Sequence, residues 1–227
     1  ALGLTPGTAT NLVIDNDSQV RANRNALGAL GISLHDAFGN IVRDRTDQIT
    51  ATIVSGPGGN LSGTTAISVP AAASASAVVS FGDLVISGLV GVHIIEFASD
   101  QAGIATVSHA VTLTHGAATQ LSVVTPASSA RSGIDFGQQP VIEIQDADGN
   151  RVSTSATASL PIAVTYVGQP ASAGGVDLSG TTTVNAQNGS AAFTDLRLTG
   201  VSASYTIRFS LVSDSSFSVS QQVAVGA

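Results

Sequence analysis

The sequence contains no cysteine and no lysine among its 227 residues. Without cysteine the chain forms no disulfide and offers no thiolate for catalysis or metal binding. Because all eight basic residues are arginine, a Lys–Asn isopeptide cross-link, a Schiff base on lysine and a phosphate-binding loop that ends in lysine are also excluded. Several common kinds of chemistry are thereby ruled out before any motif is considered.

Aromatic and charged side chains are also scarce. Aromatic residues make up 4% of the chain, with no tryptophan and two tyrosines, and charged residues make up 10%. Apolar residues reach 43%, which is typical of a folded chain with a core of Val, Ile, Leu and Ala. The formal net charge of −7 argues against nucleic acid as a partner, because a surface that binds DNA or RNA needs clustered positive charge.

Long hydrophobic runs are missing as well. The most apolar stretch, residues 84–95, is too short for a membrane-spanning helix and is interrupted by Gly88, Gly91 and His93, so we expect no membrane insertion. The chain begins with residues 1–4 as Ala-Leu-Gly-Leu, without a basic segment or an initiator methionine. We expect it to be part of a longer extracellular or cell-surface protein.

What the sequence does contain is an internal repeat. Five short motifs occur twice in the same order, about 110 residues apart, which indicates two copies of one structural unit. The block Leu-Ser-Gly-Thr-Thr recurs unchanged, at residues 61–65 and 178–182. The other pairs are Thr10–Leu12 with Thr119–Leu121, Asp36–Asn40 with Asp146–Asn150, Phe81–Leu84 with Phe193–Leu196, and His93–Phe97 with Tyr205–Phe209. We therefore predict two domains, residues 1–114 and 115–227.

Each copy has the pattern of an all-β protein. Ser, Thr, Val and Gly are abundant, which favours strands and turns over helices. In the second copy we expect about seven short strands, near residues 119–124, 139–145, 161–167, 181–185, 190–194, 204–211 and 217–225. Strands at this spacing, without a helix, predict two tandem immunoglobulin-like β-sandwich domains.

Two local signals predict how these strands are connected. Asn188-Gly189 lies between two strand-like runs and predicts a tight hairpin, because both residues tolerate a positive φ. Tyr205 follows the bend at residues 196–200, which is where a tyrosine corner belongs in such domains. His93 holds the matching position in the first copy.

These features resemble the bacterial immunoglobulin-like repeats of large surface and secreted proteins, including the invasin and intimin type. The resemblance covers essentially the whole chain. It rests on the Asp-Ala-x-Gly-Asn-x-Val runs at 36–42 and 146–152, on the two Leu-Ser-Gly-Thr-Thr blocks, and on the stretch from Gly189 through Phe193 to Tyr205. The first copy departs from it with an Ala/Ser run at 71–77 in place of a tight turn. The resemblance implies a module strung into a stalk with neighbouring repeats of its parent chain, and it transfers no functional residue.

Three functions are compatible with this organisation. The first is a non-enzymatic structural spacer that extends a distal function from the cell surface. The second is a module that binds a cell-surface glycan or protein through its loops, with Phe38 as the candidate ligand-binding residue because it is a loop aromatic. The third is a filament subunit. Residues 1–5 match the end of the first copy's last strand, so they are either the tail of a preceding repeat or a strand donated to a neighbour.

No catalytic residue is predicted. Ser, Asp and His are plentiful, but no Gly-x-Ser-x-Gly elbow occurs, and abundance is not a triad. The only glutamates, Glu96 and Glu143, are expected at outward strand positions, whereas glycoside cleavage needs acids in a cleft. We therefore expect no enzymatic activity.

One run has the start of a calcium-binding loop. Asp146, Asp148 and Asn150 have the required spacing, and Ca²⁺ is the only cofactor considered. An EF-hand would continue with glycine at its sixth position and an acid at its twelfth, where this sequence has arginine and threonine. The alternative is a turn in which Asp146 caps its own backbone, and the first copy favours it, because Phe38 replaces Asp148 there.

Other possible ligands for an ion are dispersed. The four histidines contain no His-x-x-x-His pair, although His93 and His109 are expected on neighbouring strands. A calcium site at the domain junction stays an open alternative, since no spacing selects its ligands from Asp15, Asp17, Asp83 and Asp195.

The arginines of the first copy form two small groups among aspartates. Such mixed charge is typical of a solvated surface. The alternative is a contact with a carboxylate or an acidic sugar. The residues are Arg21 with Arg24, and Arg43 with Arg45.

Overall fold

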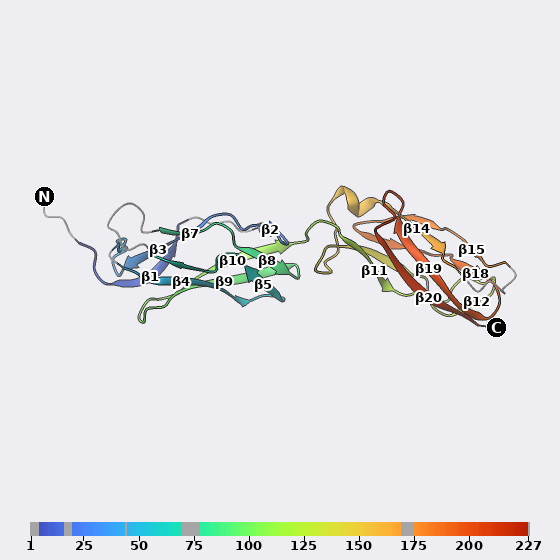
Figure 1. Ribbon diagram of the computed structural model, residues 1–227, viewed down its shortest axis with the longest axis horizontal. Coiled ribbons are helices and arrows are strands. Elements are labelled where there is room, and N and C mark those ends of the chain that lie inside the picture. Colours follow the sequence, from blue (N-terminus) through green and yellow to red (C-terminus); the bar gives the residue numbers. More distant parts are fainter. Residues whose placement is uncertain (1–4, 16–19, 44, 70–77, 169–174, 227) are drawn as a thin grey trace. The chain divides into compact units, whose positions relative to one another are not determined.

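The computed structural model describes residues 5–15, 20–43, 45–69, 78–168 and 175–226. The chain divides into two compact units, Ala1–Gly116 and Ala117–Ala227. This division lies slightly beyond the boundary predicted after residue 114. In Figure 1 the strands of the first unit run from blue to green, and those of the second from yellow-green to red. The predictions for residues 1–4 and for the Ala/Ser run at 71–77 concern residues outside the described ranges.

The described part of the first unit contains ten strands. They are β1 (Ala9–Ile14), β2 (Val20–Ala22), β3 (Leu30–Asp36), β4 (Gln48–Ser55), β5 (Gly59–Ser62), β6 (Ala66–Ser68), β7 (Val78–Phe81), β8 (Val85–Gly88), β9 (Gly91–Ser99) and β10 (Val107–Thr114). One sheet has the order β1-β3-β7 and the other the order β2-β10-β9-β4-β6. β5 and β8 form a separate two-stranded ribbon.

The second unit repeats this arrangement. Its described strands are β11 (Gln120–Thr125), β12 (Ala130–Arg131), β13 (Val141–Gln145), β14 (Pro161–Tyr166), β15 (Asp177–Ser179), β16 (Thr183–Asn185), β17 (Ser190–Ala192), β18 (Arg197–Thr199), β19 (Ala203–Leu211) and β20 (Ser218–Gly226), and η1 (Ala156–Ser159) is a short 3₁₀ helix. The sheets have the orders β11-β13-β17 and β12-β20-β19-β14-β16, with β15 and β18 as the ribbon.

Both units are immunoglobulin-like β-sandwiches, so the predicted fold class is confirmed. In the usual strand letters, the small sheet has the order A-B-E, and the large sheet has the order G-F-C with a further strand beside C. β2 and β12 add a short parallel pairing to the last strand of each unit, β10 and β20 respectively. The other strand pairs are antiparallel, as expected for a sandwich built from short strands.

The predicted number of strands is too small. In the second unit the prediction misses β12, β15 and β18, which are two or three residues long. Such short strands cannot display the alternation of apolar and polar residues that identifies a strand in a sequence. It also misses the 3₁₀ turn η1, a single turn without an amphipathic pattern.

The tight turn predicted at Asn188-Gly189 forms, but the prediction that it joins two paired strands as a hairpin is wrong. Both residues have a positive φ, 50° and 79°, and the flanking Gln187 and Ser190 exchange two backbone hydrogen bonds of 2.7 and 3.1 Å. However, the strands on either side, β16 and β17, belong to different sheets. The turn therefore carries the chain from one sheet to the other. A Cβ on Gly189 would lie 2.1 Å from the Val152 carbonyl oxygen, so the position requires glycine.

Each unit has its own hydrophobic core. In the first unit the rings of Phe81 and Phe97, from opposite sheets, have centroids 5.1 Å apart, and in the second unit Phe193 and Phe209 repeat the contact at 5.4 Å. The remaining core is mostly Leu, Ile, Val and Ala, as the composition predicts. Because full burial of one such large side chain contributes roughly 1.5–3 kcal/mol, each core is large enough to hold its own sandwich together.

Candidate functional site

The run proposed for calcium forms a compact turn after β13. Asp146 is 1% exposed, and its Oδ1 accepts hydrogen bonds from the backbone N–H groups of Asp148 at 2.9 Å and Asn150 at 3.0 Å. The Asn150 side-chain amide donates to both carboxylate oxygens, at 3.1 and 3.0 Å. Gly149 supplies the positive φ of 82°. The carboxylate thus caps its own turn, which is the alternative to the calcium interpretation.

The turn brings Asp146, Asp148 and Asn150 together. They bond to one another, with Asp148 and Asn150 donating N–H groups to the Asp146 carboxylate. A cation at Asp146 would have to displace N–H groups that already point at its oxygens. In the ranges that the structure describes, no group of three or more His, Asp or Glu side chains could hold a metal ion. The calcium hypothesis stays a prediction.

Asp36 caps the matching turn of the first unit. Its carboxylate accepts hydrogen bonds from the backbone N–H groups of Phe38 at 2.9 Å, Asn40 at 2.9 Å and Gly7 at 2.8 Å. The pKa of Asp36 lies well below its ordinary value of 3.8. The largest cause is the hydrogen bond from the Asn40 side chain, and the next are those from the backbone N–H groups of Gly7 and Asn40. The turn is therefore anionic and closed at neutral pH, and it ties the segment before β1 to the end of β3.

Phe38 stands at the tip of this closed turn. Its side chain is 89% exposed, so it contributes nothing to the core. Its backbone is fixed from both sides, by the bond to Asp36 and by Gly39 with a φ of 82°. The second unit has Asp148 in its place. An aromatic ring held in solvent by a rigid turn suits the predicted ligand-binding role, which stays a prediction.

The repeated Leu-Ser-Gly-Thr-Thr block forms a contact that the sequence did not predict. Thr181 donates from its backbone N–H to Asp195 Oδ1 at 2.8 Å and from its hydroxyl to Oδ2 at 2.9 Å. Thr64 and Asp83 repeat both bonds, at 3.0 and 2.8 Å. We call this pair of bonds the Thr–Asp latch. In each unit these bonds lower the pKa of the aspartate below its ordinary value. The bond from the threonine backbone N–H has the largest effect, and the bond from the hydroxyl has the second largest.

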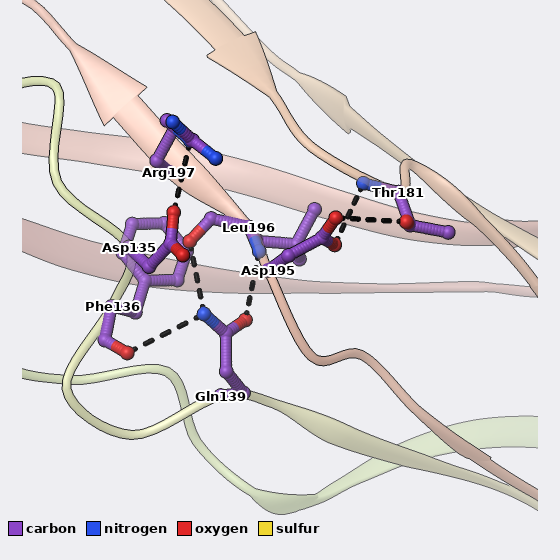
Figure 2. A network of polar contacts seen from close by, with 7 residues as sticks. All are labelled: Asp135, Phe136, Gln139, Thr181, Asp195, Leu196 and Arg197. Carbon is purple, nitrogen blue, oxygen red and sulfur yellow. Dashed lines mark hydrogen bonds and ion pairs between the residues drawn. The ribbon is translucent and has the colours of Figure 1, made fainter.

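Further polar contacts surround the latch of the second unit (Figure 2). The Gln139 side-chain amide donates to the Leu196 carbonyl at 3.0 Å and accepts from the Leu196 N–H at 3.1 Å, so it replaces one rung of a β-ladder. Arg197 Nε lies 2.9 Å from Asp135 Oδ1, but its N–H is not aligned for a hydrogen bond. Both side chains of this ion pair are more than 40% exposed, so the pair contributes little to stability. The network fastens a loop to a strand and leaves no acid free for catalysis among the residues in Figure 2.

The carboxylates considered for a junction site are also engaged. Asp83 and Asp195 belong to the latches, and Asp15 accepts a hydrogen bond from the Ser33 hydroxyl at 3.0 Å. Asp17 lies outside the described residues. Glu96 and Glu143 lie at half-exposed positions that alternate with core residues of β9 and β13, as predicted.

The predicted tyrosine corner is confirmed. The Tyr205 hydroxyl donates to the Val201 carbonyl at 2.6 Å. His93, at the same position of the first unit, is fully buried, and its two ring nitrogens each lie 3.3 Å from a carbonyl oxygen, of Gly91 and of Gly58. The histidine thus contacts a different segment, the turn that leads into β5.

His93 and His109 lie on neighbouring strands, as expected. The register pairs His93 with Val111 and His109 with Ile95, which makes the two histidines diagonal neighbours on the inner face of one sheet. Both side chains are at most 5% exposed. Their location among core residues indicates a role in packing.

Contacts within the first unit hold the side chains of Arg21 and Arg45. Arg21 Nε donates to the Leu27 carbonyl at 2.9 Å, and Arg45 Nε lies 2.7 Å from Asp47 Oδ1. Arg43 is exposed and makes no ion pair or hydrogen bond with any residue that the structure describes.

Within its described residues, the protein has no helix that is both long and apolar enough to cross a membrane.

No protein-family model and no curated protein matches the sequence. Among solved structures, the chain is similar to domains 5–6 of the S-layer protein SbsC, with 15% identity, a TM-score of 0.32, and coverage of 98% of this chain and 99% of that one. It is also similar to the Escherichia coli adhesin FdeC, with 13% identity, a TM-score of 0.34, and coverage of 96% and 65%. A β-glycosidase from Bacteroides vulgatus matches with 12% identity, a TM-score of 0.40, and coverage of 96% and 25%. This chain thus spans a quarter of the glycosidase, and the fold assignment rests on the strand order described above.

Proposed function

We propose that the chain is a pair of non-catalytic structural modules, a spacer segment of an extracellular bacterial surface or adhesin-like protein. The observation that carries the proposal is the use of its polar residues. The recurring polar motifs of both units, the capped Asp turn and the Thr–Asp latch, bind the chain's own backbone. The residues of these two recurring motifs thus serve folding.

The proposed mechanism is mechanical. Each unit closes its own core, so under tension one unit unfolds while the other stays intact. The Gly7–Asp36 bond ties the segment before the first strand of the first unit to the sandwich, and the long β19–β20 ladder ties the last strand of the second unit. The partners that fit this role are neighbouring repeats of the same parent chain, and neither a nucleic acid nor membrane insertion is part of it.

Single-molecule force spectroscopy on the full chain tests this proposal. We expect two separate unfolding events, each releasing about 100 residues or roughly 350 Å of chain at about 3.3–3.6 Å per residue. A Gly180→Ala variant should lower the force of one event and leave the other unchanged, because its latch lies in the second unit. A single event that releases the whole chain would contradict independent modules.

A second candidate function is ligand binding by the first unit. It is favoured by the exposed ring of Phe38 on its rigid turn, a feature without a structural use.

A further inference from the structure

A hollow of about 490 Å³ lies beside the start of β1 in the first unit. It is bounded by the segment from Thr5 to Ala9 on one side and by Val42, Arg43 and Arg45 on the other. This volume lies in the range of pockets that hold small molecules. The lining combines hydroxyl groups, the apolar surfaces of Pro6 and Val42, and two guanidinium groups.

The positive charge of the hollow is available to a ligand. The Arg43 side chain is exposed and has no partner among the described residues. Arg45 is fixed through Nε by Asp47, whose carboxylate also accepts a bond from the Ser99 hydroxyl at 3.0 Å. That ion pair orients the Arg45 guanidinium, whose terminal nitrogens make no hydrogen bond to a described residue. Two guanidinium groups at one hollow favour a carboxylate, which they bind through paired hydrogen bonds.

Two aspartates near the hollow, Asp36 and Asp47, are engaged by other groups of the protein. Asp36 is 3% exposed, and its two carboxylate oxygens accept hydrogen bonds from the Gly7 and Asn40 N–H groups. Asp47 is likewise 3% exposed and is paired with Arg45. Both acids are therefore turned into the protein, and Asp47 offsets the charge of Arg45. Among the residues that the structure describes, Arg43 thus carries the exposed, unpaired charge of the hollow, and Asp44 lies outside those residues.

The exposed aromatic ring belongs to the same end of the unit. Gly7 of the hollow and Phe38 donate their backbone N–H groups to the two oxygens of one carboxylate, that of Asp36. The Phe38 turn and the hollow are thus neighbours across a single side chain. The exposed ring of Phe38 on this turn offers a surface for the apolar face of a sugar ring.

The second unit provides an internal comparison. Its capped Asp turn is the same, but Asp148 replaces Phe38, Ser153 replaces Arg43 and Ser155 replaces Arg45. The residues that hold the turn are thus kept, while the aromatic ring and both positive charges are absent from the second copy. Folding does not require Phe38 or Arg43, since the second unit adopts the same sandwich without them.

We propose that the hollow of the first unit binds a carboxylate-bearing sugar. Arg43 and Arg45 pair with the carboxylate, the hydroxyls of Thr5 and Thr8 bond to sugar hydroxyls, and Phe38 packs on the sugar ring. The mixed lining and the adjoining aromatic ring favour an acidic sugar over an inorganic anion, which would use the arginines alone.

Isothermal titration calorimetry of the full chain with a trisaccharide of galacturonate tests the proposal. We expect saturable binding that weakens about tenfold or more in Arg43→Gln, because a charge-assisted contact is lost, and several-fold in Phe38→Ala. The matched control is Arg131→Gln, which changes an exposed arginine of the second unit and should bind as the parent chain does. Unchanged melting temperatures of the variants would show that each is folded.

Three outcomes would overturn the proposal: no binding of the trisaccharide, equal binding of the neutral galactose trisaccharide, or unchanged binding by Arg43→Gln. Equal binding of an oligoglutamate peptide would also overturn it, since it would show a general carboxylate contact. None of these outcomes depends on the two unfolding events expected of a spacer, so the two proposals fail independently.

Discussion

The Thr181 hydroxyl donates to Asp195 Oδ2 at 2.9 Å, and Thr64 repeats the bond to Asp83 at 2.8 Å in the first unit. The bond joins the turn between β15 and β16 to the segment between β17 and β18. Since β17 belongs to the small sheet and β16 to the large one, the latch fastens connections that leave different sheets. The most similar sequence block in the two copies therefore marks a folding device.

Replacing Gly180 by alanine should open this latch. Gly180 has a φ of 101°, and a Cβ there would lie 2.2 Å from the Asp195 carbonyl oxygen. We expect a loss of at least about 2 kcal/mol in the free energy of unfolding, measured by urea denaturation. The matched control is Gly149→Ala, which has a φ of 82° but no neighbouring atom closer than 4.0 Å. Equal losses in the two variants would show that backbone strain alone, and not the latch, accounts for the effect.

The protein should lose stability as the solution becomes acidic. The pKa values of Asp36, Asp83, Asp195 and Asp214 all lie below the ordinary value of 3.8 in the folded state. As the pH falls through 3.8 the unfolded chain therefore binds more protons than the folded one, so the stabilisation is present above this pH and is lost below it. We expect the urea midpoint to fall steeply between about pH 5 and pH 3.

An Asp195→Asn variant isolates the part of this acid response that belongs to one latch. It should be less stable than the parent chain at pH 7 and should lose less between pH 5 and pH 3. Asp177→Asn, which changes an exposed aspartate of β15, is the control and should follow the parent chain. An acid response of Asp195→Asn as steep as that of the parent chain would assign the effect to other groups.

Removing the Tyr205 hydroxyl should weaken the second unit. A Tyr205→Phe variant keeps the buried ring but leaves the Val201 carbonyl without its donor, which costs about 1–2 kcal/mol. Tyr166→Phe is the matched control, because Tyr166 packs edge-on against Tyr205 at 5.9 Å through its ring. Thermal unfolding followed by circular dichroism measures both. A Tyr205→Phe melting temperature equal to that of the parent chain would contradict a stabilising tyrosine corner.

Calcium should not change the stability of the turn at Asp146. We expect the same melting temperature in millimolar calcium and in EDTA, because the Asp146 carboxylate is already filled by N–H donors. Asp146→Ala should lose about 2–3 kcal/mol under both conditions, since several donors lose their acceptor. The finding that would establish the predicted cation site is a calcium-dependent rise in melting temperature that disappears in Asp148→Ala.

The sequence predicted the features that depend on neighbouring residues. Asn188 and Gly189 specify their turn because few residues accept a positive φ, and the capped Asp turns need only five consecutive positions. Alternation over β19 identified Tyr205, Ile207 and Phe209 as one face of a strand, and all three are buried. These signals are local, so one copy of the repeat is enough to read them.

Other features depend on residues that are far apart in the chain. The recurrence of Gly180-Thr181 together with Asp195 in both copies was visible, but nothing in a linear pattern says that the two motifs touch. The same holds for the hollow in the first unit, which residues 5–9 line together with Arg43 and Arg45. The short strands β12, β15 and β18 exist only because a partner strand is supplied from elsewhere in the chain.

By itself, the sequence determined that this protein is two copies of one sandwich with aliphatic cores, because composition, alternation and turn chemistry act over a few residues at a time. Only the tertiary structure decided what the polar residues do. The sequence shows that Asp195, Asp146 and Arg43 are charged, but not which groups lie near them. The fold decides which groups come within hydrogen-bonding distance, and therefore whether a charged side chain stabilises a turn or can bind a ligand.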